Sequence, residues 1–127
     1  YRAKAYLLHQ QLNAAIEDLK IISADTKTAF GAESKYLLAS VYFQQEKLTE
    51  AENEILDFAK KNTPHQFWLA RSFVLLADIY IKKGNDFQAK QYLLSLKRNY
   101  TVQDEIQGLI DERLSAISQR EKKNIIH

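Results

Sequence analysis

The chain has 127 residues, of which only three are glycine and one is proline. At average usage, about 15 residues of these two types would be expected. Because hairpins and tight turns consume both, their scarcity excludes collagen-like, linker-rich and turn-dense all-β structures and favours long helices. The chain is 46% hydrophobic and 27% charged, which excludes a disordered chain and is typical of a globular domain.

The charges are nearly balanced, with 18 basic and 16 acidic residues and a formal net charge of +2. This balance argues against nucleic-acid and anionic-membrane binding. There is no cysteine, so a disulfide framework and thiolate chemistry are excluded. No apolar run approaches the roughly 18 residues needed to span a bilayer, so no membrane span is expected.

An internal repeat is the strongest signal in the chain. Three tyrosines each have an alanine three residues before and another nine residues after, followed by two large apolar residues. Separations of three or four place side chains on one helix face, and small alanines let two helices approach closely. The pattern therefore predicts helical hairpins. Its positions are Tyr6, Tyr42 and Tyr80; Ala3, Ala39 and Ala77; Ala15, Ala51 and Ala89; Leu19, Ile55 and Leu93; and Ile22, Phe58 and Leu96.

Local signals predict where the helices begin and end. Thr49 with Glu52 is typical of a capping box, and Gly84 is typical of a left-handed C-terminal cap. The last helix has an apolar stripe but no further copy of the repeat, so we expect it to cap the array. The predicted helices cover about 1–10, 13–24, 29–45, 50–61, 64–83, 87–98 and 102–121.

The repeat resembles the tetratricopeptide repeat (TPR) in its long-period bacterial form. The resemblance rests on Leu-Leu-Ala-Ser-Val-Tyr before Ala51 and Ile55, and on Leu-Leu-Ala-Asp-Ile-Tyr before Ala89 and Leu93. Alanine replaces the glycine that is frequent before the tyrosine. The stretch 63–80 is also similar to the C-terminal end of large TPR proteins of Bacteroidetes-type bacteria.

This resemblance implies an all-α fold, an α-α superhelix of about three TPR-like hairpins and a C-terminal capping helix. A single domain over 1–127 would contain repeats at about 1–28, 29–63 and 64–99, with the capping helix at 101–121. Because the chain opens in what reads as mid-helix, we expect it to be part of a longer TPR protein.

In the TPR family, the first helix of each hairpin lines a concave face that binds a peptide or helix of a partner. The asparagine of the family's carboxylate clamp is absent, since Ser40 and Asp78 take its place. An acidic chaperone C-terminal peptide is therefore not expected. The partner-binding residues that the resemblance implies are Lys4, Leu7, Leu8, Glu33, Tyr36, Ser40, Phe43, Gln44, Arg71, Val74, Asp78, Ile81 and Lys82.

The sequence contains no pattern that predicts catalysis. The histidines at 9, 65 and 127 are too far apart in the chain for a metal-binding motif. The isolated glycines do not form a phosphate-binding loop. We therefore expect no enzyme activity, no metal and no cofactor.

The expected function is a non-enzymatic protein–protein interaction scaffold, with a partner peptide or its own upstream repeats against the concave face. Two alternatives are an RNA-binding helical repeat and a regulatory arm of an upstream enzyme domain. Glu33 and Asp78 oppose Arg71 and Lys82 in the predicted groove, so we expect no nucleic acid there. The resemblance favours a periplasmic or cell-envelope location, with the cytoplasm as the alternative.

Overall fold

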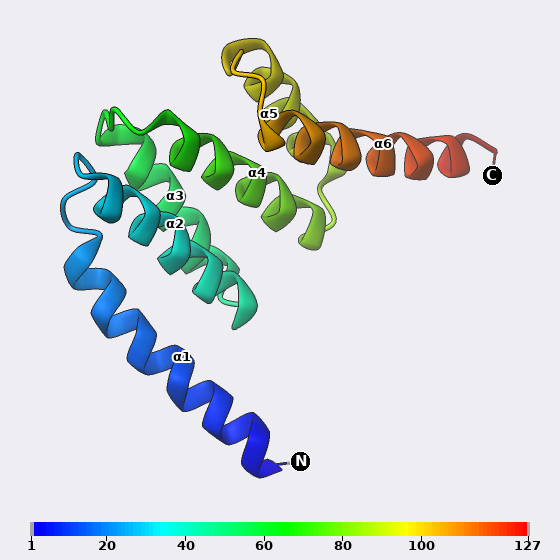
Figure 1. Cartoon of the computed structure of the whole chain (residues 1–127). Coiled ribbons are helices and arrows are strands. Elements are labelled where there is room, and N and C mark those ends of the chain that lie inside the picture. Colours follow the sequence, from blue (N-terminus) through cyan, green and yellow to red (C-terminus); the bar gives the residue numbers. More distant parts are fainter. Residues whose placement is uncertain (1, 127) are drawn as a thin grey trace. The chain divides into compact units, whose positions relative to one another are not determined.

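The structure is a computed structural model that describes the backbone of residues 2–126 and the side chains of residues 10–123. Within this range it contains six helices and no strand (Figure 1), which confirms the predicted all-α class. None of these helices is long and apolar enough to cross a membrane. The helices are α1 (Arg2–Ile22), α2 (Ala29–Gln44), α3 (Leu48–Lys60), α4 (Gln66–Lys82), α5 (Asp86–Asn99) and α6 (Glu105–Ile126).

The first repeat does not form the predicted hairpin. A single helix, α1, replaces the two expected at 1–10 and 13–24. The residues at the expected turn, Gln10 to Asn13, include no glycine or proline, and glutamine and leucine are good helix formers. The TPR superhelix stays a prediction. In that prediction, α2–α3 and α4–α5 are the two remaining hairpins.

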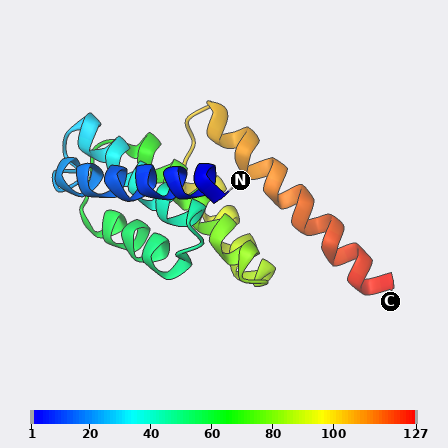
Figure 2. The ribbon, with the colours of Figure 1, turned by 90° about the horizontal axis from the view of Figure 1, so that it is seen from below.

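The chain divides into two compact units, Tyr1–Leu69 and Ala70–His127, and α4 crosses the boundary between them. In the first unit, α2 is the middle helix and contacts both α1 and α3 (Figure 2). In the second unit, α5 contacts α6. The single domain over 1–127 stays a prediction.

The repeated alanines lie where helices pack together. In the first unit, Ala39 and Ala51 are at most 1% exposed, and Phe58 is fully buried. Ala77 and Ala89 are equally buried in the second unit. The packing role predicted for these positions is therefore confirmed in the second and third copies.

The first helix of each hairpin ends in the same left-handed turn. Glu46 has φ 61° and Gly84 has φ 79°. In both turns the next residue donates its backbone N–H back to the repeat tyrosine: Lys47 to Tyr42 at 2.9 Å, and Asn85 to Tyr80 at 2.8 Å. The cap predicted at Gly84 is confirmed, and the other copy builds it with a residue that is strained there.

Substitutions at the two turn residues should change the free energy of unfolding in opposite directions. Glu46→Gly should raise the free energy of unfolding of the first unit by about 0.5 kcal/mol, since glycine adopts positive φ without strain. Gly84→Ala should lower that of the second unit by about 1 kcal/mol. Urea unfolding of each variant measures both changes, and changes of the same sign would contradict the shared turn.

The capping box predicted at Thr49 and Glu52 is wrong. Helix α3 begins at Leu48, and Lys47 takes the N-cap position without a side-chain hydrogen bond. Thr49 already lies inside the first turn, so its hydroxyl cannot occupy the cap.

The loop between α1 and α2 is held by its own hydrogen bonds and by one from the loop between α3 and α4. The Thr28 hydroxyl accepts from the Gly31 N–H at 2.9 Å and donates to the Asp25 carbonyl at 3.0 Å. From the α3–α4 loop, the Thr63 hydroxyl donates to the Thr26 carbonyl at 2.6 Å, and this bond is buried. The beginning of α2 is therefore fixed in position.

Helix α6 packs through an isoleucine stripe. Ile106 and Ile110 are fully buried, and Ile117 is 1% exposed. These residues repeat at helical spacing, so they form one face. The apolar stripe predicted for the last helix is confirmed from Ile106 onward, but its predicted first member, Val102, is exposed because the helix begins three residues later than expected.

Candidate functional site

Helix α2 carries large apolar side chains on two opposite sides. Its buried side includes Leu38 and Ala39, each 1% exposed, and its other side carries Phe30 at 65% and Leu37 at 40% exposure. Phe30 and Leu37 are seven residues apart, so they share one face. The outer side of a surface helix is usually polar, so two exposed apolar side chains on this face are a notable feature of the first unit.

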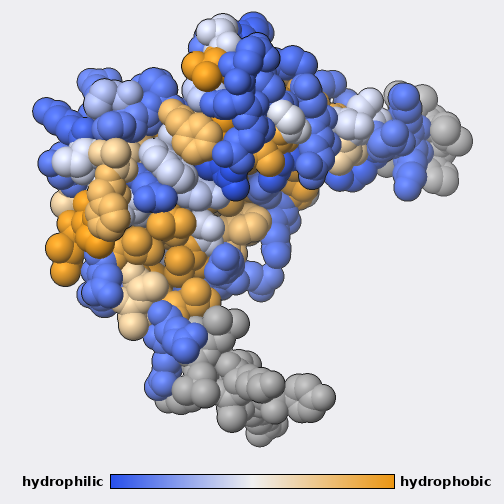
Figure 3. Space-filling model, in the orientation of Figure 1, coloured by the Kyte–Doolittle hydropathy of each residue, from blue (hydrophilic) through white to orange (hydrophobic). Residues whose placement is uncertain are grey.

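Five residues at alternating spacings of three and four define this face, which we call the outer stripe of α2. Glu33 and Ser40 on it are half-buried, and Gln44 is exposed. In Figure 3 the apolar colouring gathers over α2 and the adjoining part of α1. The members of the stripe are Phe30, Glu33, Leu37, Ser40 and Gln44.

The structure brings together five of the predicted partner-binding residues on or beside this stripe. Glu33, Ser40 and Gln44 belong to it, while the half-buried Tyr36 and Phe43 lie along its edge. The Tyr36 ring lies 5.7 Å from the ring of Trp68, measured between centroids. Whether these residues bind a partner stays a prediction.

The two most exposed members of the stripe were not predicted from the sequence. Leu37 belongs to the Leu-Leu pair that precedes Ala39, and Phe30 lies at the beginning of the predicted second repeat, but neither was among the predicted partner-binding residues. Their seven-residue spacing, opposite the buried positions of the same helix, is the signal that would have identified them.

Among the predicted residues of α4, Val74 is wrong as a surface residue because it is only 3% exposed. It lies four residues after Ala70 and three before Ala77, both of which are buried. Residues at this spacing share one face, so Val74 belongs to the core. Ile81 is half-buried and Lys82 is exposed.

The two other charged residues predicted on α4 are engaged within the second unit. Asp78 accepts two hydrogen bonds from Arg113 of α6, at 2.7 Å from Nε and 3.0 Å from Nη2. Arg71 lies 3.3 Å from the Glu105 carboxylate. These side chains therefore help to hold α6. Lys4, Leu7 and Leu8 lie outside the residues whose side chains are described.

A buried lysine is the second notable feature of the first unit. Lys35 of α2 is 8% exposed, and its Nζ donates to Glu54 at 2.6 Å and to Asp57 at 2.7 Å. The two acidic residues are three positions apart on α3, so their carboxylates lie on one face. Lys35, Glu54 and Asp57 together form what we call the charged trio.

The charged trio keeps Lys35 in its ammonium form. Burial alone would lower the pKa of Lys35, but the hydrogen bonds and charges of Asp57 and Glu54 outweigh it and raise the pKa above its usual value. The hydrogen bond from Lys35 lowers the pKa of Asp57. An amine whose pKa is raised stays protonated at neutral pH and is a poor nucleophile, so the geometry fits a structural ion cluster.

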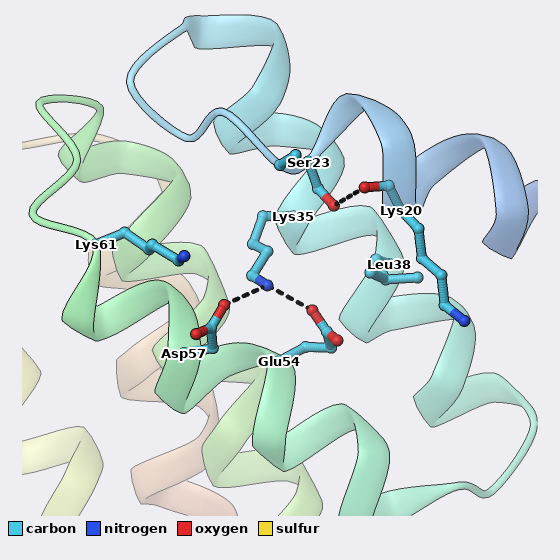
Figure 4. A pocket seen from close by; sticks show the side chains of 8 residues that line it. Lys20, Ser23, Lys35, Leu38, Glu54, Asp57 and Lys61 are labelled. Carbon is cyan, nitrogen blue, oxygen red and sulfur yellow. Dashed lines mark hydrogen bonds and ion pairs between the residues drawn. The ribbon is translucent and has the colours of Figure 1, made fainter.

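A hollow of about 140 Å³ lies beside the charged trio. Figure 4 shows the Lys35 side chain reaching between Asp57 and Glu54, while Lys20 points away from them. Its three lysines and two carboxylates nearly cancel, so the hollow has little surplus charge with which to select an ion. The hollow is lined by Lys20, Ser23, Ala24, Lys35, Leu38, Glu54, Asp57 and Lys61.

The third copy of the repeat holds uncharged residues at the positions of the charged trio. Thirty-eight residues further along the chain these are Phe73, Tyr92 and Ser95. The rings of Phe73 and Tyr92 stack with their centroids 6.3 Å apart. Helices α2 and α3 are therefore joined by ion pairs at these positions, and helices α4 and α5 by stacked aromatic rings.

Among the described residues, no group of three histidine, cysteine, aspartate or glutamate side chains could hold a metal ion. Comparisons with known proteins found no matching family model, curated protein or solved structure. The function is therefore inferred from the chain's own residues.

Proposed function

We propose that the chain is a non-enzymatic, TPR-like helical-repeat module that binds a helix or peptide of a partner protein through the outer stripe of α2. The observation that carries this proposal is the exposure of Phe30 and Leu37 on one face of a helix. Burial of apolar surface stabilises a complex by about 25 cal/mol per Å² before the costs of association. Large exposed apolar side chains on one face therefore favour a protein-binding surface.

The composition of the stripe supports protein over RNA as the partner. Its only charged member is Glu33, and the other charged residue of α2, Lys35, is buried in the charged trio. Binding of a phosphate backbone requires lysine or arginine side chains at the surface. An RNA strand would instead meet a carboxylate here.

Peptides selected from a displayed library against the immobilised chain test this proposal. We expect Phe30→Glu and Leu37→Glu each to weaken binding of a selected peptide at least about tenfold, since each removes an apolar contact and adds a charge. Fluorescence anisotropy with the labelled peptide measures the dissociation constants, and circular dichroism establishes that the variants fold.

Phe87 of α5 provides the matched control, because it is a phenylalanine with a similar exposure of 72% in the second unit. Phe87→Glu should leave the affinity unchanged. Binding that depends on Phe87 but not on Phe30 or Leu37 would refute the outer stripe as the site, as would a library that yields no binding peptide.

A further inference from the structure

The outer stripe carries one charge between two apolar side chains. Glu33 lies three residues after Phe30 and four before Leu37, so all three share one face of α2. Glu33 is half-buried and has no ion-pair partner among the residues that the structure describes. A partner that covers both apolar side chains must also cover this carboxylate.

Covering an unpaired carboxylate is unfavourable because it removes water from the charge. A lysine or arginine of the partner, placed between its own apolar contacts, would replace that water and give the carboxylate a counter-charge. The stripe therefore selects a partner with a cation between two apolar residues, and disfavours one with an acidic residue there.

The spacing of the apolar side chains selects the conformation of the partner. Seven residues of helix rise about 10.5 Å, so a second helix presents matching side chains at its own positions i and i+7. An extended chain advances about 3.3 Å per residue and would reach this distance after three residues. Side chains three apart on a β-strand point to opposite faces, so a β-strand cannot supply both contacts at this spacing.

A second copy of this chain does not fit the same requirement. A two-fold interface uses the same patch on both copies. If two α2 helices pair antiparallel with Phe30 against Leu37, the symmetry axis passes beside Glu33. If they pair parallel, each residue faces the same residue of the other chain. Both arrangements bring two Glu33 carboxylates together, which is repulsive.

We infer, on the basis of the proposed function, that the partner segment is a basic amphipathic α-helix of another protein. Its apolar residues lie at i and i+7, with a lysine or arginine at i+3 or i+4. The apolar pair supplies the contact area, and the cation pairs with Glu33.

Two stapled helical peptides of identical composition test this inference. Both carry leucine at i and i+7; one has lysine between the leucines and glutamate on the opposite face, and the other has these two residues exchanged. Wild-type chain should bind the first peptide about tenfold more tightly than the second. Glu33→Lys should reverse the preference, and the difference should shrink at high salt.

Glu50→Lys is the matched control, because Glu50 is an exposed glutamate on α3 and the charge change is the same. This variant should keep the wild-type preference. Equal binding of both peptides to the wild type and to Glu33→Lys, with loss of both on Phe30→Glu, would overturn the inference and leave the proposed function standing. Failure of both peptides to bind, or binding that Phe30→Glu leaves unchanged, would overturn both.

Discussion

Replacing Gly31 by alanine should lower the free energy of unfolding of the first unit by about 2 to 3 kcal/mol, although alanine is the better helix former. A β-carbon at this position would lie 1.8 Å from the Asp25 carbonyl oxygen and 2.8 Å from the Thr28 hydroxyl. The first of these atoms belongs to the backbone and cannot rotate away. The substitution therefore forces the loop between α1 and α2 to move.

Moving this loop breaks contacts that fix the beginning of α2. The hydrogen bond from the Gly31 N–H to Thr28 caps the helix, and loss of such a cap costs about 1 kcal/mol. The buried bond from Thr63 to the Thr26 carbonyl would be lost as well. Urea unfolding followed by the fluorescence of Trp68, the only tryptophan of the chain, reports on the first unit.

Gly108 is the matched control for this substitution. It is an exposed residue inside α6, and a β-carbon there would meet no atom within 4 Å. Gly108→Ala should therefore raise the free energy of unfolding of the second unit by about 0.5 to 1 kcal/mol, which urea unfolding followed by far-ultraviolet circular dichroism measures. If Gly31→Ala were tolerated as well as Gly108→Ala, the close approach of the loop to α2 would be disproved.

Removing the amine of the charged trio should have an effect of similar size. Lys35→Ala leaves two carboxylates side by side and should lower the free energy of unfolding by about 2 kcal/mol. This is less than a fully buried pair would cost, because the Asp57 side chain is 48% exposed and its charge is screened. Lys61→Ala, an exposed lysine lining the same hollow, should change stability by less than about 0.5 kcal/mol.

The third copy of the repeat suggests how to restore the loss. Lys35→Phe, Glu54→Tyr and Asp57→Ser together place the residues of the α4–α5 hairpin on α2 and α3. Replacing a buried ion cluster by packed apolar groups often leaves stability unchanged. The free energy of unfolding of the triple variant should therefore lie within about 1 kcal/mol of the wild-type value. A triple variant as unstable as Lys35→Ala would show that the two hairpins are not equivalent at these positions.

The contribution of the charged trio should depend on pH at both extremes. The pKa of Asp57 is lowered from 3.8, so its contribution is complete above that value and is lost as the pH falls through the lower folded-state pKa. The pKa of Lys35 is raised from 10.5, so its contribution is complete below that value and is lost as the pH rises through the folded-state pKa.

The stability difference between wild type and Lys35→Ala should therefore be constant from about pH 5 to 9 and should shrink outside this range. Chemical unfolding of both proteins at a series of pH values measures it. A stability difference between the two proteins that grows below pH 4 would contradict the ion pairs of the charged trio.

The helices were largely predictable because helix periodicity and chain breakers act locally. Gly84 marks the end of α4 by its freedom to adopt positive φ, and the repeated alanines mark the packed faces. The same register was misleading in the first copy, where Tyr6 and Ala15 suggested a hairpin. A local spacing cannot show that Gln10 to Asn13 continue the helix when no breaker interrupts them.

The features of the candidate site depend on contacts that the local sequence does not show. Lys35 resembles any surface lysine until α3 brings Glu54, nineteen residues away, to its Nζ. Its register equivalent, Phe73, was the available signal that this position is enclosed. The exposure of Leu37 likewise depends on where α1 and α3 lie, because the adjacent Leu38 of the same pair is buried.

The proposal that the outer stripe of α2 binds a partner helix is tested most directly by an NMR titration of the isotope-labelled chain with a library-selected peptide. We expect the largest chemical-shift changes at Phe30, Glu33 and Leu37, with little change at Phe87. Changes centred on α5, or on the hollow beside Lys35, with the outer stripe unaffected, would contradict it.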